Sequence, residues 1–271
     1  MEGGSGMEAN IARDAKKIVI KIGSSTLTSP DGSIDKGFLD SFASQVKALM
    51  DQGKKVILVS SGAGAAGANT IGKWSRKEDL HYKQALCAIG QVELMDSYRR
   101  TFDQYGIHIA QILLTKEDFD SSQRTMNIRN TLFTLLDEGV VPIVNENDTV
   151  STDEIKIGDN DILAANTSVV WGADLLVLLS RIRGIYDSDP TTHGDAKVIP
   201  VIDDIDVLEE KLSSADPEST KAGGIKTKLK AARLANKYGI PMIVIHGKTD
   251  DVISRITEGD FEGTLFAPHS R

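Results

Sequence analysis

The sequence predicts an α/β fold in which helices cover both faces of a largely parallel sheet. Six short runs are rich in β-branched and aliphatic residues, and several are apolar throughout, as strands buried on both faces must be. Helical patterns lie between these runs, and this alternation indicates βαβ units. With 271 residues, of which 40% are hydrophobic and 26% charged, the chain is long enough to bury a full core around such a sheet.

The elements follow from the sequence in chain order. The expected strands are 18–22, 56–59, 107–114, 140–144, 175–179 and 242–245. The first helix has a suitable N-cap in Asp35, apolar residues on one face, and Gly53 just past its end. Further helices are expected over 79–105, 122–137, 161–171 and 227–238. Because ligands of open α/β sheets bind at the carboxyl ends of the strands, we expect the chemistry in the loops that follow them.

Charge, apolar run length and cysteine content exclude several classes of protein. The net charge of −8 disfavours nucleic acid as a partner. The longest aliphatic runs, such as 175–179, fall far short of the roughly 18–20 residues that span a bilayer, so no membrane partner is expected. A single cysteine excludes an internal disulfide, and the histidines lack a zinc spacing, which favours the cytoplasm. Residues 1–6 lack the features of a signal peptide, and we expect them to be a cloning remnant.

The first expected strand carries a lysine, Lys21, and ends in a small-residue turn at 23–26. A lysine inside an apolar strand is costly to bury without an anion, and glycine and serine let backbone N–H groups approach a phosphate closely. The alternative is a lysine at a strand end whose ammonium reaches water. The segment is therefore a candidate phosphate site.

The second expected strand is followed by residues 60–67, which fit the three-glycine pattern of dinucleotide-binding turns. That interpretation needs an acidic residue at the end of the next strand, whereas Glu78 and Asp79 lie in a polar stretch that enters a helix. The match is therefore weak, and a hydride-transfer enzyme is kept as an alternative function. Tight packing of a strand against a helix is an alternative role for the glycines.

Two further loops hold polar residues at unusual density. Residues 145–150 and 158–161 combine carboxylates and carboxamides, which can bind the ammonium of an amino acid or fix lysines. An exposed acidic loop and a magnesium or calcium site are the alternatives. Residues 222–228 bring two glycines, a hydroxyl and two lysines to a helix N-terminus, where free N–H groups and the helix dipole favour an anion. Solvated lysines at a helix end are the alternative there.

Taken together and in order, six segments resemble the amino acid kinase family over residues 17–266. They are 19–28 (VIKIGSSTLT), 59–67 (VSSGAGAAG), 106–115, 141–149 (VPIVNENDT), 154–161 (EIKIGDND) and 223–232 (GGIKTKLKAA). The resemblance implies an open αβα sandwich with a mostly parallel central sheet, formed by one domain over 7–271. It implies a glutamate-binding lobe over about 17–165 and an ATP-binding lobe over about 166–271. Many bacterial members append a PUA domain, which we do not expect here.

The same resemblance implies ATP-dependent phosphorylation of the γ-carboxylate of L-glutamate, the first step of proline biosynthesis. Mg²⁺ would be bound mainly through the nucleotide phosphates. The most similar members are commonly inhibited by proline, and we expect a homo-oligomer. One alternative is another member of the family, such as one that phosphorylates N-acetylglutamate. The dehydrogenase considered above is the other.

The resemblance also implies residue roles. The phosphate-handling lysines and the carboxylate that holds them, which we expect to be catalytic, are Lys21, Lys228 and Asp161. The expected glutamate contacts are Ser61, Asp148 and Asn160. No direct protein ligand to a metal is expected.

The expected nucleotide contacts are Lys21, Gly23, Ser180, Arg181, Ala222, Gly223, Gly224, Lys226, Thr227 and Lys228. At two of these positions the sequence departs from the family pattern, since an acidic residue is usual at Arg181 and a small polar one at Lys226. Proline is expected to act through the loop 149–158, with Glu154 as a regulatory residue.

Overall fold

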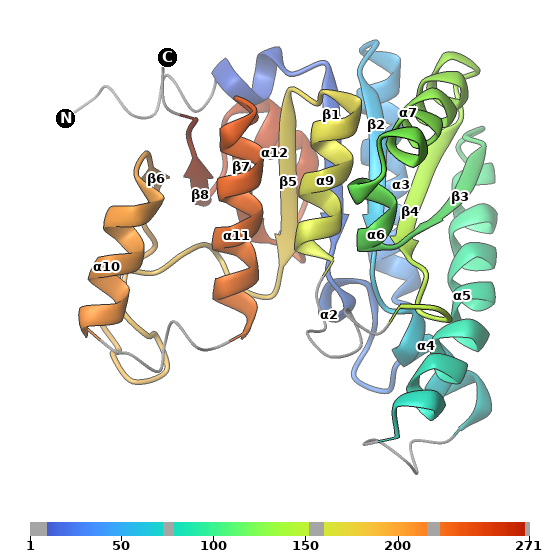
Figure 1. Ribbon diagram of the computed structural model, residues 1–271, viewed down its shortest axis with the longest axis horizontal. Coiled ribbons are helices and arrows are strands. Elements are labelled where there is room, and N and C mark those ends of the chain that lie inside the picture. Colours follow the sequence, from blue (N-terminus) through green and yellow to red (C-terminus); the bar gives the residue numbers. More distant parts are fainter. Residues whose placement is uncertain (1–9, 73–78, 152–159, 216–222, 269–271) are drawn as a thin grey trace.

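The structure, a computed structural model, describes residues 10–72, 79–151, 160–215 and 223–268. Its strands are β1 (Lys17–Ile22), β2 (Lys55–Ser60), β3 (Ile109–Leu114), β4 (Val141–Glu146), β5 (Leu175–Ser180), β6 (Val201–Ile202), β7 (Met242–His246) and β8 (Gly263–Phe266). They form one sheet in the order β3-β4-β2-β1-β5-β7-β8-β6 (Figure 1). The strands of the two predicted lobes are continuous, because β1 pairs with both β2 and β5. The predicted lobe boundary near 165–173 lies at the end of the helix that precedes β5.

The predicted parallel sheet is confirmed, with one exception at its edge. Every neighbouring pair of strands is parallel except β7 and β8, which are antiparallel. The two strands absent from the prediction are β6, of two residues, and β8, of four. Runs this short show no period from which a strand can be inferred.

A short helix over residues 10–14 precedes β1, and the other helices of the described residues lie between the strands. They are α2 (Ser24–Leu27), α3 (Lys36–Asp51), α4 (Ala63–Ile71), α5 (Leu80–Asp103), α6 (Lys116–Asp120), α7 (Ser122–Asp137), α9 (Asp161–Trp171), α10 (Ile205–Ala215), α11 (Gly223–Lys237) and α12 (Val252–Glu258). Asp35 caps α3 as predicted, accepting from the backbone N–H of Phe38 at 3.1 Å. The helix predicted from residue 227 begins earlier, at Gly223, so the glycine pair lies in its first turn. None of the helices in the described ranges combines the length and apolar character that a bilayer span requires.

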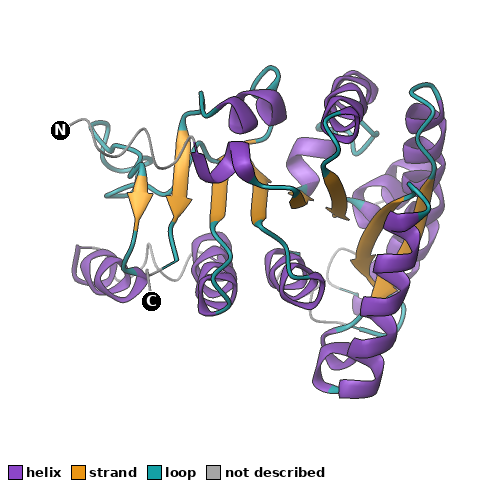
Figure 2. Cartoon of the chain, turned by 90° about the horizontal axis from the view of Figure 1, so that it is seen from above, coloured by secondary structure: helices purple, strands orange, loops and turns teal. Residues whose placement is uncertain are grey.

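The helices form a layer on each face of the sheet (Figure 2). One buried cluster joins Ile18, Ile20 and Ile22 of β1 to α3, α5 and α12. The other joins Val19 of β1 to α7, α9, α10 and α11. Because side chains alternate along a strand, Lys21 falls on the same face as Val19. The period of β1 thus directs this lysine toward α9 and α11.

Two glycines let α4 and α5 cross at backbone contact. A Cβ on Gly67 would lie 1.9 Å from the carbonyl oxygen of Leu86, and one on Gly90 would lie 1.8 Å from that of Ala63. Both distances are far below any tolerable contact, so only glycine fits at these positions. Gly67 therefore lies within a helix and serves close packing, which favours the packing explanation of the 60–67 pattern over dinucleotide binding.

Candidate active site

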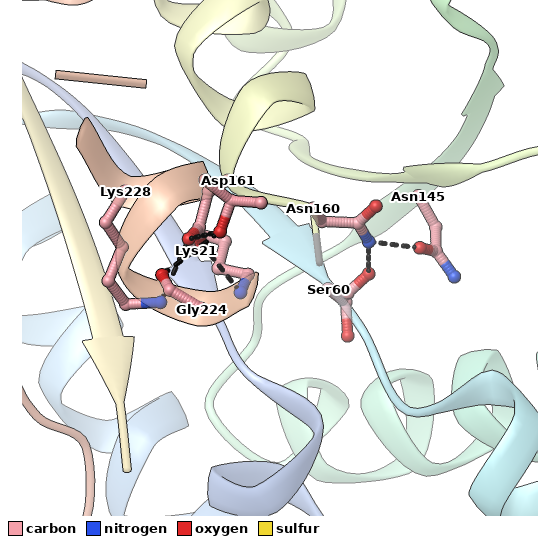
Figure 3. A network of polar contacts seen from close by, with 8 residues as sticks. Lys21, Ser60, Asn145, Asn160, Asp161, Gly224 and Lys228 are labelled. Atoms are coloured by element: carbon pink, nitrogen blue, oxygen red, sulfur yellow. Dashed lines mark hydrogen bonds and ion pairs between the residues drawn. The ribbon is translucent and has the colours of Figure 1, made fainter. Parts of the chain in front are cut away.

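The carboxyl ends of β1, β2, β4 and β5 meet the N-termini of α9 and α11 at one edge of the sheet. Two sets of polar contacts lie here, side by side (Figure 3). One is centred on Asp161, the first residue of α9, and the other on Asn160, the residue before it. The arrangement brings together loops that are more than 200 residues apart in the sequence.

Asp161 holds two lysines from opposite ends of the chain. Its Oδ1 lies 2.9 Å from Nζ of Lys21, and its Oδ2 lies 3.0 Å from Nζ of Lys228. The Thr227 hydroxyl donates to the same Oδ2 at 3.2 Å. The side chain of Asp161 is fully buried, and those of Lys21 and Lys228 are only 6% and 7% exposed. One carboxylate thus limits the repulsion between two buried ammonium groups.

Local structure explains how these three side chains converge. Asp161 lies in the first turn of α9, where the positive end of the helix dipole stabilises a carboxylate. Lys228 and Thr227 lie near the start of α11, whose N-terminus favours an anion such as phosphate. Gly23, two residues after Lys21, lies against the end of β5, since a Cβ on it would lie 3.2 Å from the Leu179 carbonyl oxygen. Two cations and a helix N-terminus therefore face the same edge of the sheet.

Asn160 connects the ends of β2 and β4. Its Nδ2 donates to the carbonyl oxygen of Ser60 at 2.8 Å and to Oδ1 of Asn145 at 2.7 Å. Asn145 in turn donates through Nδ2 to Oε1 of Gln91 on α5 at 2.8 Å. Because the side chain of Asn160 makes these contacts, it makes no capping hydrogen bond to α9. The network fixes the loop after β2 relative to the loop after β4.

Two buried polar side chains, Ser61 and Asp148, lie next to this network. Ser61 is 4% exposed, and its hydroxyl has no hydrogen-bond partner among the described residues. Burial raises the pKa of Asp148 to about 6, while a hydrogen bond from the thiol of Cys87 opposes the rise. No cationic side chain of the described ranges contributes to that pKa. A buried hydroxyl and a buried carboxylate without a cation can together hold an ammonium or another donor.

A cavity of about 320 Å³ opens beside Lys228. Its lining is mostly apolar and includes Ser180 at the end of β5, Arg181 just after it, Tyr186, and Gly224 at the start of α11. Its position and lining suit the flat heterocycle of a nucleotide, with the phosphates of that nucleotide reaching the two lysines.

The structure brings together most of the expected site residues, with exceptions. Arg181 lines the cavity but is exposed, and Lys226 lies on the exposed side of α11. Ala222 and Glu154 lie outside the described residues. Sequence reasoning missed Gln91 and Cys87, because only their spacing of four along α5 hinted at a shared face.

The sequence is similar to known proteins over most of its length. Residues 16–246 match the amino acid kinase family. A protein named glutamate 5-kinase from Alkaliphilus metalliredigens (strain QYMF) is 54% identical, covering 96% of this chain and 98% of that protein. A second protein of that name, from Alkaliphilus oremlandii (strain OhILAs), is 50% identical over 96% of this chain and 99% of its own length.

A solved structure of isopentenyl phosphate kinase has the same fold. It aligns with 93% of this chain and all of its own, with a TM-score of 0.65 and 18% sequence identity. The low identity makes this a likeness of fold alone. The predicted open αβα sandwich is confirmed.

Proposed function

The chain belongs to the amino acid kinase family, and we propose that it transfers the γ-phosphoryl group of ATP to the γ-carboxylate of L-glutamate. An oxygen of the carboxylate would form a bond to the γ-phosphorus as the bond to the β-γ bridging oxygen breaks. The products would be L-glutamyl 5-phosphate and ADP, which retains the electron pair of the broken bond. Two relatives named glutamate 5-kinase, matched over nearly their full length, support this proposal. The acyl phosphate would supply proline biosynthesis.

The observation that carries the proposal is the burial of Lys21 and Lys228 on one carboxylate, Asp161. A glutamate side chain with a pKa near 4.3 is already ionised at neutral pH, so its attack needs no general base. The barrier comes instead from bringing a carboxylate up to a polyanion and holding the two in line. Two fixed ammonium groups neutralise the phosphoryl oxygens as charge develops. We assign this catalytic role to the two lysines and the positioning role to Asp161.

Magnesium would enter this reaction as part of the nucleotide substrate. Both oxygens of Asp161 are already in ion pairs with lysine ammonium groups, so this carboxylate suits the holding of these lysines rather than direct metal ligation. We propose that Mg²⁺ is held chiefly by the phosphate oxygens of ATP. It would add charge neutralisation to that supplied by the lysines.

Substrate recognition follows from Asp148, Ser61 and Asn160, which we assign to glutamate. Among the described residues no cation contributes to the pKa of the buried Asp148 carboxylate, so a substrate ammonium would stabilise it. The amide of N-acetylglutamate carries no charge there, so Asp148 favours the free amino acid. Since Asp148, Ser61 and Asn160 all lie within residues 17–165, we assign glutamate binding to this lobe. Residues 166–271, with the cavity beside Ser180, bind ATP.

A hydroxamate trap tests the proposed reaction. Hydroxylamine captures the acyl phosphate formed from ATP with glutamate, N-acetylglutamate or aspartate, each offered in parallel. We expect product with glutamate, and Asp148→Asn should lose most of this preference over N-acetylglutamate. Preferred use of N-acetylglutamate by the wild-type enzyme would overturn the substrate assignment. A lack of product with all three acids would overturn the reaction.

We further propose that proline competes with glutamate and that the enzyme acts in the cytoplasm as a homo-oligomer. Proline shares the α-carboxylate and ammonium of glutamate, so the groups that hold one can hold the other. Added proline should raise the apparent KM for glutamate and leave the KM for ATP unchanged. Proline titrations at several fixed glutamate concentrations measure this effect. Inhibition that glutamate does not relieve would exclude overlapping sites. Light scattering measures the oligomeric state.

A further inference from the structure

Helix α5 contacts the ends of β2 and β4 through two polar side chains, Gln91 and Tyr98. Because they are seven residues apart, they lie on the same face of the helix, two turns from each other. Oε1 of Gln91 accepts from Nδ2 of Asn145 in β4 at 2.8 Å. The Tyr98 hydroxyl lies 3.0 Å from Oγ of Ser60, the last residue of β2. One face of α5 thus reaches both strands whose ends Asn160 connects.

Gln91 is the first of three side-chain amides that are hydrogen-bonded in a row. Beyond Asn145 the row continues to Asn160, whose Nδ2 donates to Oδ1 of Asn145 at 2.7 Å. The same Nδ2 donates to the Ser60 carbonyl oxygen at 2.8 Å (Figure 3). Asn145 and Asn160 are each only 1% exposed. Both N–H bonds of the Asn160 amide are therefore used within the protein, and what this amide can offer a ligand is Oδ1, an acceptor.

The orientations of the three amides depend on one another. If the Asn160 amide were turned over, its Oδ1 would face the Ser60 carbonyl oxygen and Oδ1 of Asn145, acceptor against acceptor. Asn145 is oriented by two further contacts. Its Oδ1 also accepts from the backbone N–H of Glu146 at 2.9 Å, and its Nδ2 has its acceptor in Gln91. Gln91 therefore helps to decide which atom Asn160 presents before the first turn of α9.

The packing of α5 fixes the place of Gln91 over the sheet. Gly90, the residue before it, lies where α5 crosses α4, and a Cβ there would lie 1.8 Å from the Ala63 carbonyl oxygen. Helices in backbone contact cannot slide past each other without a clash. The acceptor on Gln91 is thus held at a set position above Asn145.

We propose that Gln91 is a positioning residue, which through Asn145 turns the Asn160 amide so that its Oδ1 accepts from the ammonium of the amino acid substrate. This inference rests on the proposed function, because it deepens the role assigned there to Asn160. An ammonium group only donates, so it is bound by the oxygen of an amide and repelled by its NH2 group. Gln91 itself touches neither substrate. The row of amides acts on recognition of the amino group and not on phosphoryl transfer.

Side-chain amide exchange tests the row without any assay of activity. The Nδ2 protons of Asn145 and Asn160 are hydrogen-bonded and buried, so NMR of the substrate-free protein should show slow exchange with solvent. Gln91→Met has a similar length but no amide acceptor, and the loss of one hydrogen bond should speed exchange at Asn145 about 10-fold. Gln91→Glu keeps an oxygen acceptor and should restore slow exchange. Unchanged exchange in Gln91→Met would overturn the proposal.

Inhibition by glutarate tests the consequence for substrate recognition. Glutarate carries both carboxylates of glutamate but no amino group, so Oδ1 of Asn160 gains no hydrogen bond from it. Gln91→Met should raise the KM for glutamate about 10-fold, which corresponds to about 1.4 kcal/mol. The inhibition constant of glutarate and the KM for ATP should stay within about 2-fold of the wild-type values. A merely structural role would weaken glutamate and glutarate alike, and that result would overturn the assignment.

Tyr98→Phe is the matched control, because it removes a buried hydrogen bond from the same face of α5 without altering an amide. It should leave the KM for glutamate within about 2-fold of the wild-type value. An increase as large as that in Gln91→Met would mean that any loosening of α5 weakens substrate binding, and the proposal would be wrong.

A measurement on the wild-type protein covers the case in which Gln91→Met does not fold. Glutamate should shift the 13C resonance of the Asn160 carboxamide carbon, because its ammonium donates to Oδ1, whereas glutarate should not. Equal shifts with the two ligands would overturn the proposal. If the wild-type enzyme phosphorylates no amino acid, the proposed function fails, while the exchange rates still decide whether Gln91 orients the other two amides.

Discussion

The buried carboxylate of Asp161 offers the most direct test of how this site is held together. Replacement by asparagine keeps the shape of the side chain and an acceptor for Thr227, but removes the negative charge that pairs with the ammonium groups of Lys21 and Lys228. Removing one partner of a buried ion pair costs about 3–5 kcal/mol. Folded domains are stable by about 5–15 kcal/mol, so Asp161→Asn should remove about a fifth or more of that stability.

An exposed pair of the same type provides the control. Asp137 lies 2.6 Å from Lys55, with side chains 65% and 43% exposed. Asp137→Asn should cost less than about 1 kcal/mol, because water screens this pair. Urea denaturation measures both free energies of unfolding. If Asp161→Asn proves no more destabilising than the control, the assignment of Asp161 as the counter-charge of two buried lysines is wrong.

Three further outcomes are expected. Lys228→Ala should lower kcat by at least about 100-fold with little change in the KM for glutamate, whereas Lys226→Ala, two residues away and exposed, should leave kcat near its wild-type value. Because burial raises the pKa of Asp148 to about 6, its carboxylate protonates as pH falls through that value, and a pH series should show the KM for glutamate rising below about pH 6. Gly90→Ala should lower the thermal midpoint by several degrees, since its Cβ would lie 1.8 Å from the Ala63 carbonyl oxygen.

Much of the fold is predictable because its strands are short apolar runs with clear helical patterns between them. The N-cap at Asp35 and the parallel central sheet follow from such local signals. The antiparallel strand β8 does not, because four residues carry no period and the strand direction depends on how the chain returns from α12. Helix α12, of seven residues, is too short to show an apolar face in the sequence.

The candidate site was predictable in its residue types but not in its contacts. Lys21 stands out as a lysine in a buried strand, and resemblance to a family links it to Lys228 and Asp161. The role of α5 is invisible in the sequence, because it depends on where α4 and α5 cross. Gln84 of α5 donates to the Asp148 carbonyl oxygen across 64 positions of the sequence, and no local pattern encodes this contact.

Asn160 and Asp161 are neighbours in the sequence yet serve opposite sides of the site (Figure 3). Asn160→Ala should leave the Ser60 carbonyl and the Asn145 side chain without their shared donor, at a cost of about 1–3 kcal/mol for buried acceptors. The loop after β2, which carries Ser61, would lose its tie to β4, so the KM for glutamate should rise. Because Asp161 begins the same helix turn, kcat should fall as well, while the KM for ATP stays within about 2-fold. Steady-state kinetics with each substrate varied measures all three constants, and an unchanged KM for glutamate would show that this amide does not organise the substrate pocket.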